Sequence, residues 1–217
     1  MHIGGLKLCN NVFLAPMAGV TDLPMRELAV ELGAGLAVGE MQSADLSLAR
    51  SRKTTQRQRH SDRAGLRSVQ IVGYDKRQLA DAARFNADLG ADIIDINMGC
   101  PAKKVVGGYS GSALMRDLKK AASLIESVVS AVDIPVSLKA RLGWDDDSKN
   151  AKELGIIAEK CGVQSFTIHG RTRNQFYKGT ADWKAILEIK QAVKIPIVTN
   201  GDIVDIGSAA NALRSSG

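Results

Sequence analysis

The sequence lacks several features that would define other classes of protein. No apolar run reaches membrane-spanning length, and the N-terminal "MHIGGLKLCN" lacks the apolar centre of a signal peptide. The three cysteines, Cys9, Cys100 and Cys161, form no CxxC pair and no zinc-ligand spacing. We therefore expect a cytoplasmic protein that has reduced thiols and binds neither membrane nor metal.

Nucleotide-binding glycine motifs are also missing. No G-x-G-x-x-G follows a predicted strand and no P-loop is present, so a dinucleotide is not held in the Rossmann manner. Aromatic residues make up only 4% of the 217 residues, but 45% are hydrophobic. That length and composition are enough for one sizeable domain with an apolar core.

Acidic residues are outnumbered by basic ones, 23 to 29, which gives a formal net charge of +6. The excess is concentrated in one segment, which contains Arg50, Arg52, Lys53, Arg57, Arg59, Arg63 and Arg67. Such a run is more often a solvated surface than a binding site. It also suits a polyanionic partner such as a nucleic acid, and both interpretations stay open.

Short β-rich segments recur along the chain. They lie at residues 11–17, 36–41, 68–73, 93–99, 135–141, 165–170 and 196–201. Most are almost continuously apolar, which is typical of parallel strands covered by helices, and helix-like segments such as 76–90 and 118–132 lie between them. The alternation predicts an α/β fold of βα repeats, either a barrel or an open sheet.

Internal similarity supports a repeat. The segment "AVDIPVSLK" at 131–139 matches "AVKIPIVTN" at 192–200 almost position for position. A glycine ends several helix-like segments just before a strand, where glycine can adopt the left-handed conformation that stops a helix. These glycines are Gly33, Gly90 and Gly162, and Gly217 has the same place in the pattern.

The repeat predicts a TIM (β/α)8 barrel truncated after seven βα units. Residues 1–217 would form one incomplete catalytic domain, and an eighth strand would follow Gly217. The alternative is a complete seven-stranded open sheet, which is less favoured because its final helix would lead to no strand.

Polar side chains and a methionine stand at the predicted strand ends, where barrel enzymes carry their catalytic groups. They are Met17, Gln70, Asn97, Cys100, Lys139, Arg141, His169, Asn200 and Asp202. Singly, each has a structural explanation, such as a satisfied core amide or a lysine that reaches solvent. Together they are costly to collect without a ligand, and their donors suit an electron-rich planar ring with carbonyls and an attached phosphate.

Cys100 follows a strand directly and lies between Gly99 and Pro101. A buried free cysteine often only fills space. An ordinary thiol has a pKa of about 8.5, so it is protonated near neutrality and can donate a proton. Lys103 and Lys104 would favour a thiolate nucleophile if they faced the sulfur. The residues alone leave filler, acid and nucleophile open.

Several segments, taken in order, resemble the tRNA-dihydrouridine synthases. They are "APMAGVTD", "VQI", "DINMGCPAKKV", "GSALM", "LKARLGWD", "IHGRTR" and "TNGDI". The form "NMGCPAKKV" followed by "GSALM" is most similar to the bacterial B-type members. The resemblance runs from residue 12 to about 203, and this ordered set of motifs is specific.

The resemblance implies an FMN-bound barrel that reduces the C5–C6 double bond of a uridine in the tRNA D-loop, with NADPH as transient electron donor. The implied flavin contacts are Pro16, Met17, Ala18, Gln70, Lys139, His169, Asn200, Gly201 and Asp202. Lys139 would offset the negative charge of the reduced flavin. Cys100 corresponds to the family's general acid, which protonates C5 while flavin N5 delivers hydride to C6.

The resemblance also implies substrate contacts. Asn97 and Arg141 correspond to residues that face the base, and the basic side chains expected at tRNA phosphates are Lys103, Lys104, Arg171 and Arg173. Family members continue into an eighth strand and a helical tRNA-binding domain. We expect a monomeric protein. Because an open barrel exposes strand edges, we expect the 1–217 chain alone to bind FMN and tRNA weakly and to be inactive.

Two other functions compete with this one. The first is a flavin-dependent reductase of a free pyrimidine, which the basic strand-end loops and "NMGCPAKKV" disfavour. The second is a non-catalytic RNA-binding or regulatory barrel. The joint presence of Cys100, Lys139 and His169 disfavours it for a full-length protein, and it is more credible if the truncated chain is the natural product.

Overall fold

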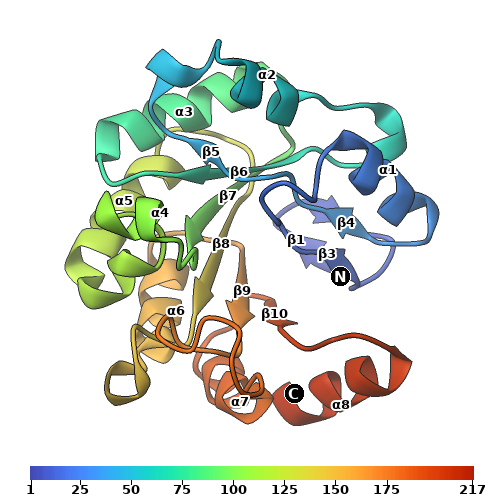
Figure 1. The fold of residues 1–217 in the computed structure, drawn as a ribbon, viewed down its shortest axis with the longest axis vertical. Coiled ribbons are helices and arrows are strands. Elements are labelled where there is room, and N and C mark those ends of the chain that lie inside the picture. The colour runs from blue at the N-terminus through green and yellow to red at the C-terminus, as the bar shows by residue number, and fades with distance from the viewer. The chain divides into compact units, whose positions relative to one another are not determined.

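A computed structural model describes every residue from Met1 to Gly217, and Figure 1 shows its helices and strands. The residues form two compact units. Unit 1 comprises residues 1–96 and 127–137, and unit 2 comprises residues 97–126 and 138–217. No helix is both long enough and apolar enough to cross a membrane.

Unit 1 begins with two short strand pairs. β1 (His2–Ile3) and β2 (Leu6–Lys7) form an antiparallel hairpin. β3 (Phe13–Leu14) then pairs in parallel with β4 (Leu36–Ala37). Their apolar side chains contribute to a buried cluster that also contains Ile93 of the central sheet.

Residues 38–43, which follow β4 and end in β5 (Gln42–Ser43), lie alongside β6 (Ser68–Val72). Val38 forms a parallel bridge with Ser68, and Gln42 pairs with Ile71. Between these two pairs, the segment 38–42 therefore contains one residue more than the segment 68–71 of β6, which defines a β-bulge. The bulge contains Glu40, whose role in the neighbouring loop is described below.

The longest strands are buried along almost their whole length. β6 pairs in parallel with β7 (Ile93–Met98), and all residues of β7 are buried. β8 (Val136–Arg141) enters unit 2, which also holds β9 (Ser165–His169) and β10 (Ile197–Asn200) as a parallel pair. The strand order in the sheet is β10-β9-β8-β7-β6-β5. Burial on both faces explains why these segments read as continuous apolar runs.

Helices alternate with the strands (Figure 1). They are α1 (Leu23–Glu31), α2 (Arg52–Gln58), α3 (Lys76–Asp88), α4 (Lys103–Gly107), α5 (Leu118–Val129), α6 (Ala151–Lys160), α7 (Trp183–Ala192) and α8 (Ile206–Ser216). Side-chain caps fix most of their starts: Asp22, Ser51, Asp75, Asp182 and Asp205 each accept a hydrogen bond from a backbone N–H of the first turn.

The predicted helix-ending glycines are confirmed. Gly33, Gly90 and Gly162 have φ values of 102°, 85° and 94°, the left-handed conformation that a side chain disfavours. Each of the seven predicted strand segments contains a strand, so the parallel α/β architecture is confirmed. β1, β2 and β5 were not predicted because two-residue strands leave no periodic pattern. The eighth strand and the single barrel domain stay predictions.

Candidate active site at the strand ends

Cys100 lies in unit 2 on the turn that follows β7, and the side chain of Asn97 shapes that turn. Asn97 Oδ1 accepts hydrogen bonds from the backbone N–H of Gly99 at 3.2 Å and of Cys100 at 3.0 Å. Asn97 is 7% exposed, and its carbonyl oxygen is therefore committed to the backbone.

The carbonyl of Cys100 is held by Ser112, a residue that sequence reasoning missed. Ser112 is fully buried, and it donates to Cys100 O from its backbone N–H at 3.1 Å and from Oγ at 2.9 Å. Gly111, with φ 59°, permits this approach, because a Cβ there would lie 2.8 Å from Cys100 O. The glycine–serine pair in "GSALM" was the available signal.

Arg141, at the end of β8, supports the loops around Cys100. Its side chain is buried, its Nε donates to Gly99 O at 2.9 Å, and its Nη1 donates to Thr172 O at 3.0 Å and to Phe176 O at 2.9 Å. Burial lowers the pKa of the guanidinium, and the nearby Tyr177 and Cys100 act in the opposite direction. Nη2 is the one guanidinium nitrogen without a protein hydrogen bond, so it alone can reach a ligand.

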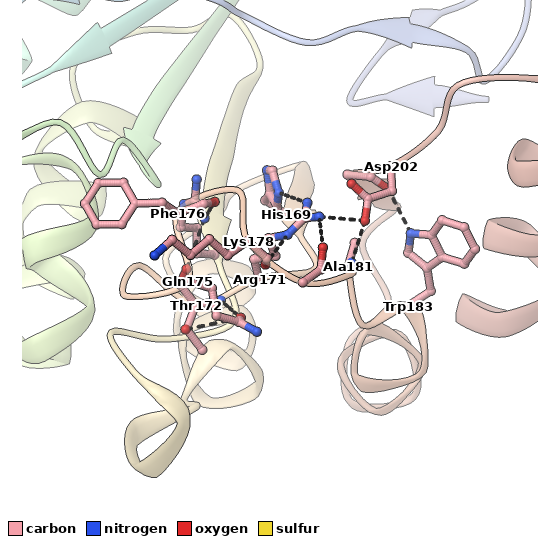
Figure 2. Close-up of polar contacts among 12 residues, drawn as sticks. His169, Arg171, Thr172, Gln175, Phe176, Lys178, Ala181, Trp183 and Asp202 are labelled. Carbon is pink, nitrogen blue, oxygen red and sulfur yellow. Dashed lines mark hydrogen bonds and ion pairs between the residues drawn. The ribbon is translucent and has the colours of Figure 1, made fainter.

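His169 ends β9 and is neutral. Burial and the positive charges of Arg141 and Lys139 lower its pKa to about 3. Arg171 Nη1 lies 3.3 Å from His169 Nε2, and because a guanidinium only donates, Nε2 is the acceptor (Figure 2). The proton is therefore on Nδ1, which is a donor.

Lys139 and Asn200 join the ends of β8 and β10. Lys139 Nζ donates to Asn200 Oδ1 at 3.0 Å, and Asn200 is the register partner of His169. Gly201 follows with φ 109°, and a Cβ on it would lie 3.1 Å from His169 Nε2. The predicted group of Lys139, His169, Asn200 and Gly201 is thus assembled in one place.

The surroundings of Arg171 differ from those expected of a phosphate contact. It is 4% exposed, pairs with Asp202 Oδ2 at 2.7 Å and donates to the carbonyls of Lys178 and Gly179 (Figure 2). A guanidinium that is buried and paired with a carboxylate is poorly placed to hold a tRNA phosphate. Although partial burial opposes ionisation of Asp202, hydrogen bonds from Ala181 N and Arg171 lower its pKa.

The other basic residues divide into a stacked arginine and two exposed lysines. The guanidinium of Arg173 lies 4.6 Å from the ring centroid of Trp144 and 4.9 Å from that of Phe176. This stacking differs from the expected phosphate contact. Lys103 and Lys104 are exposed on α4, as a phosphate contact requires.

The remaining expected cofactor residues belong to unit 1. In the loop after β3, Thr21 Oγ1 accepts from Met17 N at 3.0 Å, and Glu40 accepts from Gly19 N. Met17 is exposed, with Pro16 and Ala18 on either side. Glu40 was missed at the sequence level, although an acid directly after an apolar strand was a usable signal.

Gln70, on β6, is held by a second residue that was missed. Its Nε2 donates to Asp95 Oδ2 at 2.5 Å, and Ser137 Oγ donates to Asp95 Oδ1 at 2.6 Å. Asp95 is 3% exposed. An aspartate inside an otherwise apolar strand was the signal, because a buried carboxylate needs partners.

These features define a parallel α/β domain whose strand-end residues, in unit 2, place a thiol among cationic and amide donors. The sequence pattern of the family described as Dihydrouridine synthase (Dus) matches residues 13–217, and the chain belongs to this family.

Curated relatives agree with the family. The chain is 52% identical to a probable tRNA-dihydrouridine synthase of Rickettsia bellii and 50% identical to tRNA-dihydrouridine synthase B of Xanthomonas campestris. Both alignments cover the whole chain, and the chain spans 67% and 65% of the two relatives. Among solved structures, histamine dehydrogenase from Rhizobium sp. 4-9 matches with a TM-score of 0.71 and 14% identity over 99% of this chain and 43% of that one. This likeness shows the fold alone.

Proposed function

We propose that the chain is the catalytic part of a tRNA-dihydrouridine synthase that binds FMN and reduces the C5–C6 double bond of a D-loop uridine, with NADPH as the electron donor. The observation that carries the proposal is the presentation of Cys100 on a turn fixed by Asn97 and Ser112. Membership of the dihydrouridine synthase family supports the substrate class.

The residues of unit 2 fit a flavin. Lys139 supplies a positive charge and His169 supplies a neutral Nδ1–H donor, so together they suit a ring that carries carbonyls and gains negative charge on reduction. Asn200, Gly201 and Asp202 would complete these contacts. In unit 1 the corresponding contacts would come from Pro16, Met17, Ala18 and Gln70. Bound FMN would supply the hydride for C6.

Cys100 would supply the proton for C5. Its amide and carbonyl are both hydrogen-bonded within the protein, so only the side-chain torsion remains to place Sγ. Proton transfer from a positioned side chain typically contributes on the order of 10² to 10⁴ in rate. Asn97 therefore has a positioning role here in addition to any contact with the base.

Arg141 would orient the uracil ring through Nη2, since its other donors are committed to backbone carbonyls. The uridine must leave its stack to reach the site, at a cost of a few kcal/mol. Exposed Lys103 and Lys104 would hold the phosphates around the extruded nucleotide.

The direct test is the dihydrouridine content of tRNA from cells in which the gene is deleted and then restored. The proposal predicts loss of dihydrouridine at a D-loop position in the deletion and recovery with the restored gene. Unchanged modification in the deletion would overturn it. Reduction of free uracil by the purified protein, with no reduction of tRNA, would favour a pyrimidine reductase instead.

A further inference from the structure

Unit 1 carries a basic surface that the proposed chemistry does not use. Four exposed cations lie on and beside α2: Arg50, Arg52, Lys53 and Arg59. We call these four residues the α2 basic strip. No acid occurs between Asp45 and Asp62, and no ion pair neutralises any of the four.

Neighbouring acids already have other cationic partners. Glu27 and Glu31 lie 3.7 Å and 3.4 Å from Arg63, and Glu40 lies 3.7 Å from Arg57. His60 adds no charge near neutrality, because burial and the nearby Arg26 lower its pKa. The strip therefore keeps its net positive charge.

The sequence of α2 places positively charged side chains at the N-terminal end of the helix, where they lower helix stability. Arg52 and Lys53 occupy the first turn, which contains no acid, although the positive end of the helix dipole favours acidic side chains there. Arg52 and Arg59 are seven residues apart, so they lie on the same side of the segment. The stability of the helix itself therefore does not account for this arrangement.

The strip is also fixed in place. Arg26 Nη2 donates to Arg59 O at 2.6 Å, and Arg67 Nη2 donates to Gln58 O at 2.9 Å. Arg26 is 3% exposed, so the end of α2 is tied to the interior of unit 1. The backbone at the end of α2 is therefore ordered before a partner binds, and the loss of conformational freedom on binding is confined to the side chains of the strip.

The composition of α2 selects the class of partner. The helix "RKTTQRQ" contains no apolar residue, so it has no face that could enter a lipid surface. Its threonine and glutamine side chains can donate hydrogen bonds to phosphate oxygens, as in nucleic-acid contacts. An RNA backbone fits this surface better than an anionic membrane does.

A contact chain connects the strip with the loop after β3. Arg57 of α2 pairs with Glu40, and Glu40 accepts from the N–H of Gly19 next to the expected flavin contacts. We propose that the α2 basic strip binds phosphates of the tRNA substrate outside the modified nucleotide. This inference rests on the proposed function, since it names a second part of the surface for the same substrate.

The test compares two quadruple variants of the protein expressed from its own gene. One replaces the strip with Arg50→Gln, Arg52→Gln, Lys53→Gln and Arg59→Gln. The control removes equal charge from exposed lysines on α6 and α7, with Lys152→Gln, Lys160→Gln, Lys184→Gln and Lys190→Gln. Binding of unmodified tRNA is measured by fluorescence anisotropy at several salt concentrations, and flavin content and circular dichroism are recorded for each protein.

The strip variant should bind tRNA at least about tenfold more weakly, and the slope of log K against log salt should fall in magnitude by about 3. The control variant should keep both values, and flavin content should be unchanged in both. Equal weakening of tRNA binding in the two variants, or no weakening in the strip variant, would overturn the inference about the α2 basic strip and leave the proposed function intact. Wild-type protein that neither binds nor reduces tRNA would overturn the proposed function. Loss of binding to phosphatidylserine vesicles, with tRNA affinity retained, would assign the strip to a membrane and overturn the inference.

Discussion

The backbone carbonyl of Cys100 accepts two hydrogen bonds from Ser112, one from N and one from Oγ, at 3.1 Å and 2.9 Å. Twelve positions separate the two residues in sequence. A hydroxyl that no solvent reaches thus helps to set the orientation of the thiol-bearing residue.

Ser112→Ala should slow tRNA reduction without loss of flavin. The variant keeps the backbone contact but loses the Oγ donor, at a cost of about 1 kcal/mol in the free energy of unfolding. Turnover, flavin absorbance and urea unfolding would be compared with Ser110→Ala, whose hydroxyl only bonds Gly108 O. Equal turnover in the two variants would contradict a positioning role for Ser112.

Gly111→Ala should destabilise unit 2 by about 1–3 kcal/mol. The new methyl would need a φ near 59° and would lie 2.8 Å from both Cys100 O and Val105 Cγ1. Gly107→Ala is the matched control, because its Cβ would meet no atom within 4 Å. Thermal unfolding measures both, and the same melting temperature in the two variants would refute the account of Gly111.

Stability should fall as the pH decreases from about 6.5 towards 3, in part because of His169. Its folded-state pKa of about 3 is below the ordinary value of 6.5, so in this window the unfolded chain binds a proton that the folded chain does not. The loss attributable to His169 is up to about 2 kcal/mol between pH 6.5 and 5.

The variant His169→Gln should flatten this part of the pH profile. Urea unfolding at a series of pH values supplies the measurement. A profile for His169→Gln with the wild-type slope would show that His169 is not the titrating group.

Asp95→Asn should weaken flavin binding and lower stability by about 1–3 kcal/mol. The amide is uncharged and keeps one acceptor oxygen, so the charge-assisted hydrogen bonds from Gln70 Nε2 and Ser137 Oγ are replaced by one neutral bond to the new carbonyl oxygen and one from the new N–H to the serine hydroxyl. Asp88→Asn on the exposed face of α3 is the control. Unaltered flavin affinity in Asp95→Asn would contradict the expected contact between Gln70 and the flavin.

The sequence predicted the long strands and their polar ends because burial on both faces leaves a direct pattern. β7 and β8 are buried along almost their whole length and rich in apolar residues, and Cys100 and Arg141 lie at or just after their ends as expected. Left-handed glycines such as Gly90 were equally visible, since few other residues take that conformation.

The hydrogen-bond and stacking partners of those polar residues could not be predicted from the sequence. Arg171 and Arg173 have the same charge and similar neighbours in sequence, yet one is buried against Asp202 and the other stacks on Trp144. Only tertiary contacts distinguish a guanidinium paired with a carboxylate from one stacked on aromatic rings. The hydrogen bonds of Ser112 to Cys100 and of Asp95 to Ser137 likewise join residues that are far apart in sequence, so they could not be predicted from local patterns.

The most direct test of the central claim is the rate at which the pre-reduced flavoprotein is reoxidised on mixing with unmodified tRNA. Cys100→Ala should keep its flavin and its tRNA affinity, and its reoxidation by tRNA should be slower by on the order of 10² to 10⁴. Reoxidation at the wild-type rate, with dihydrouridine formed, would contradict the assignment of Cys100 as the proton donor.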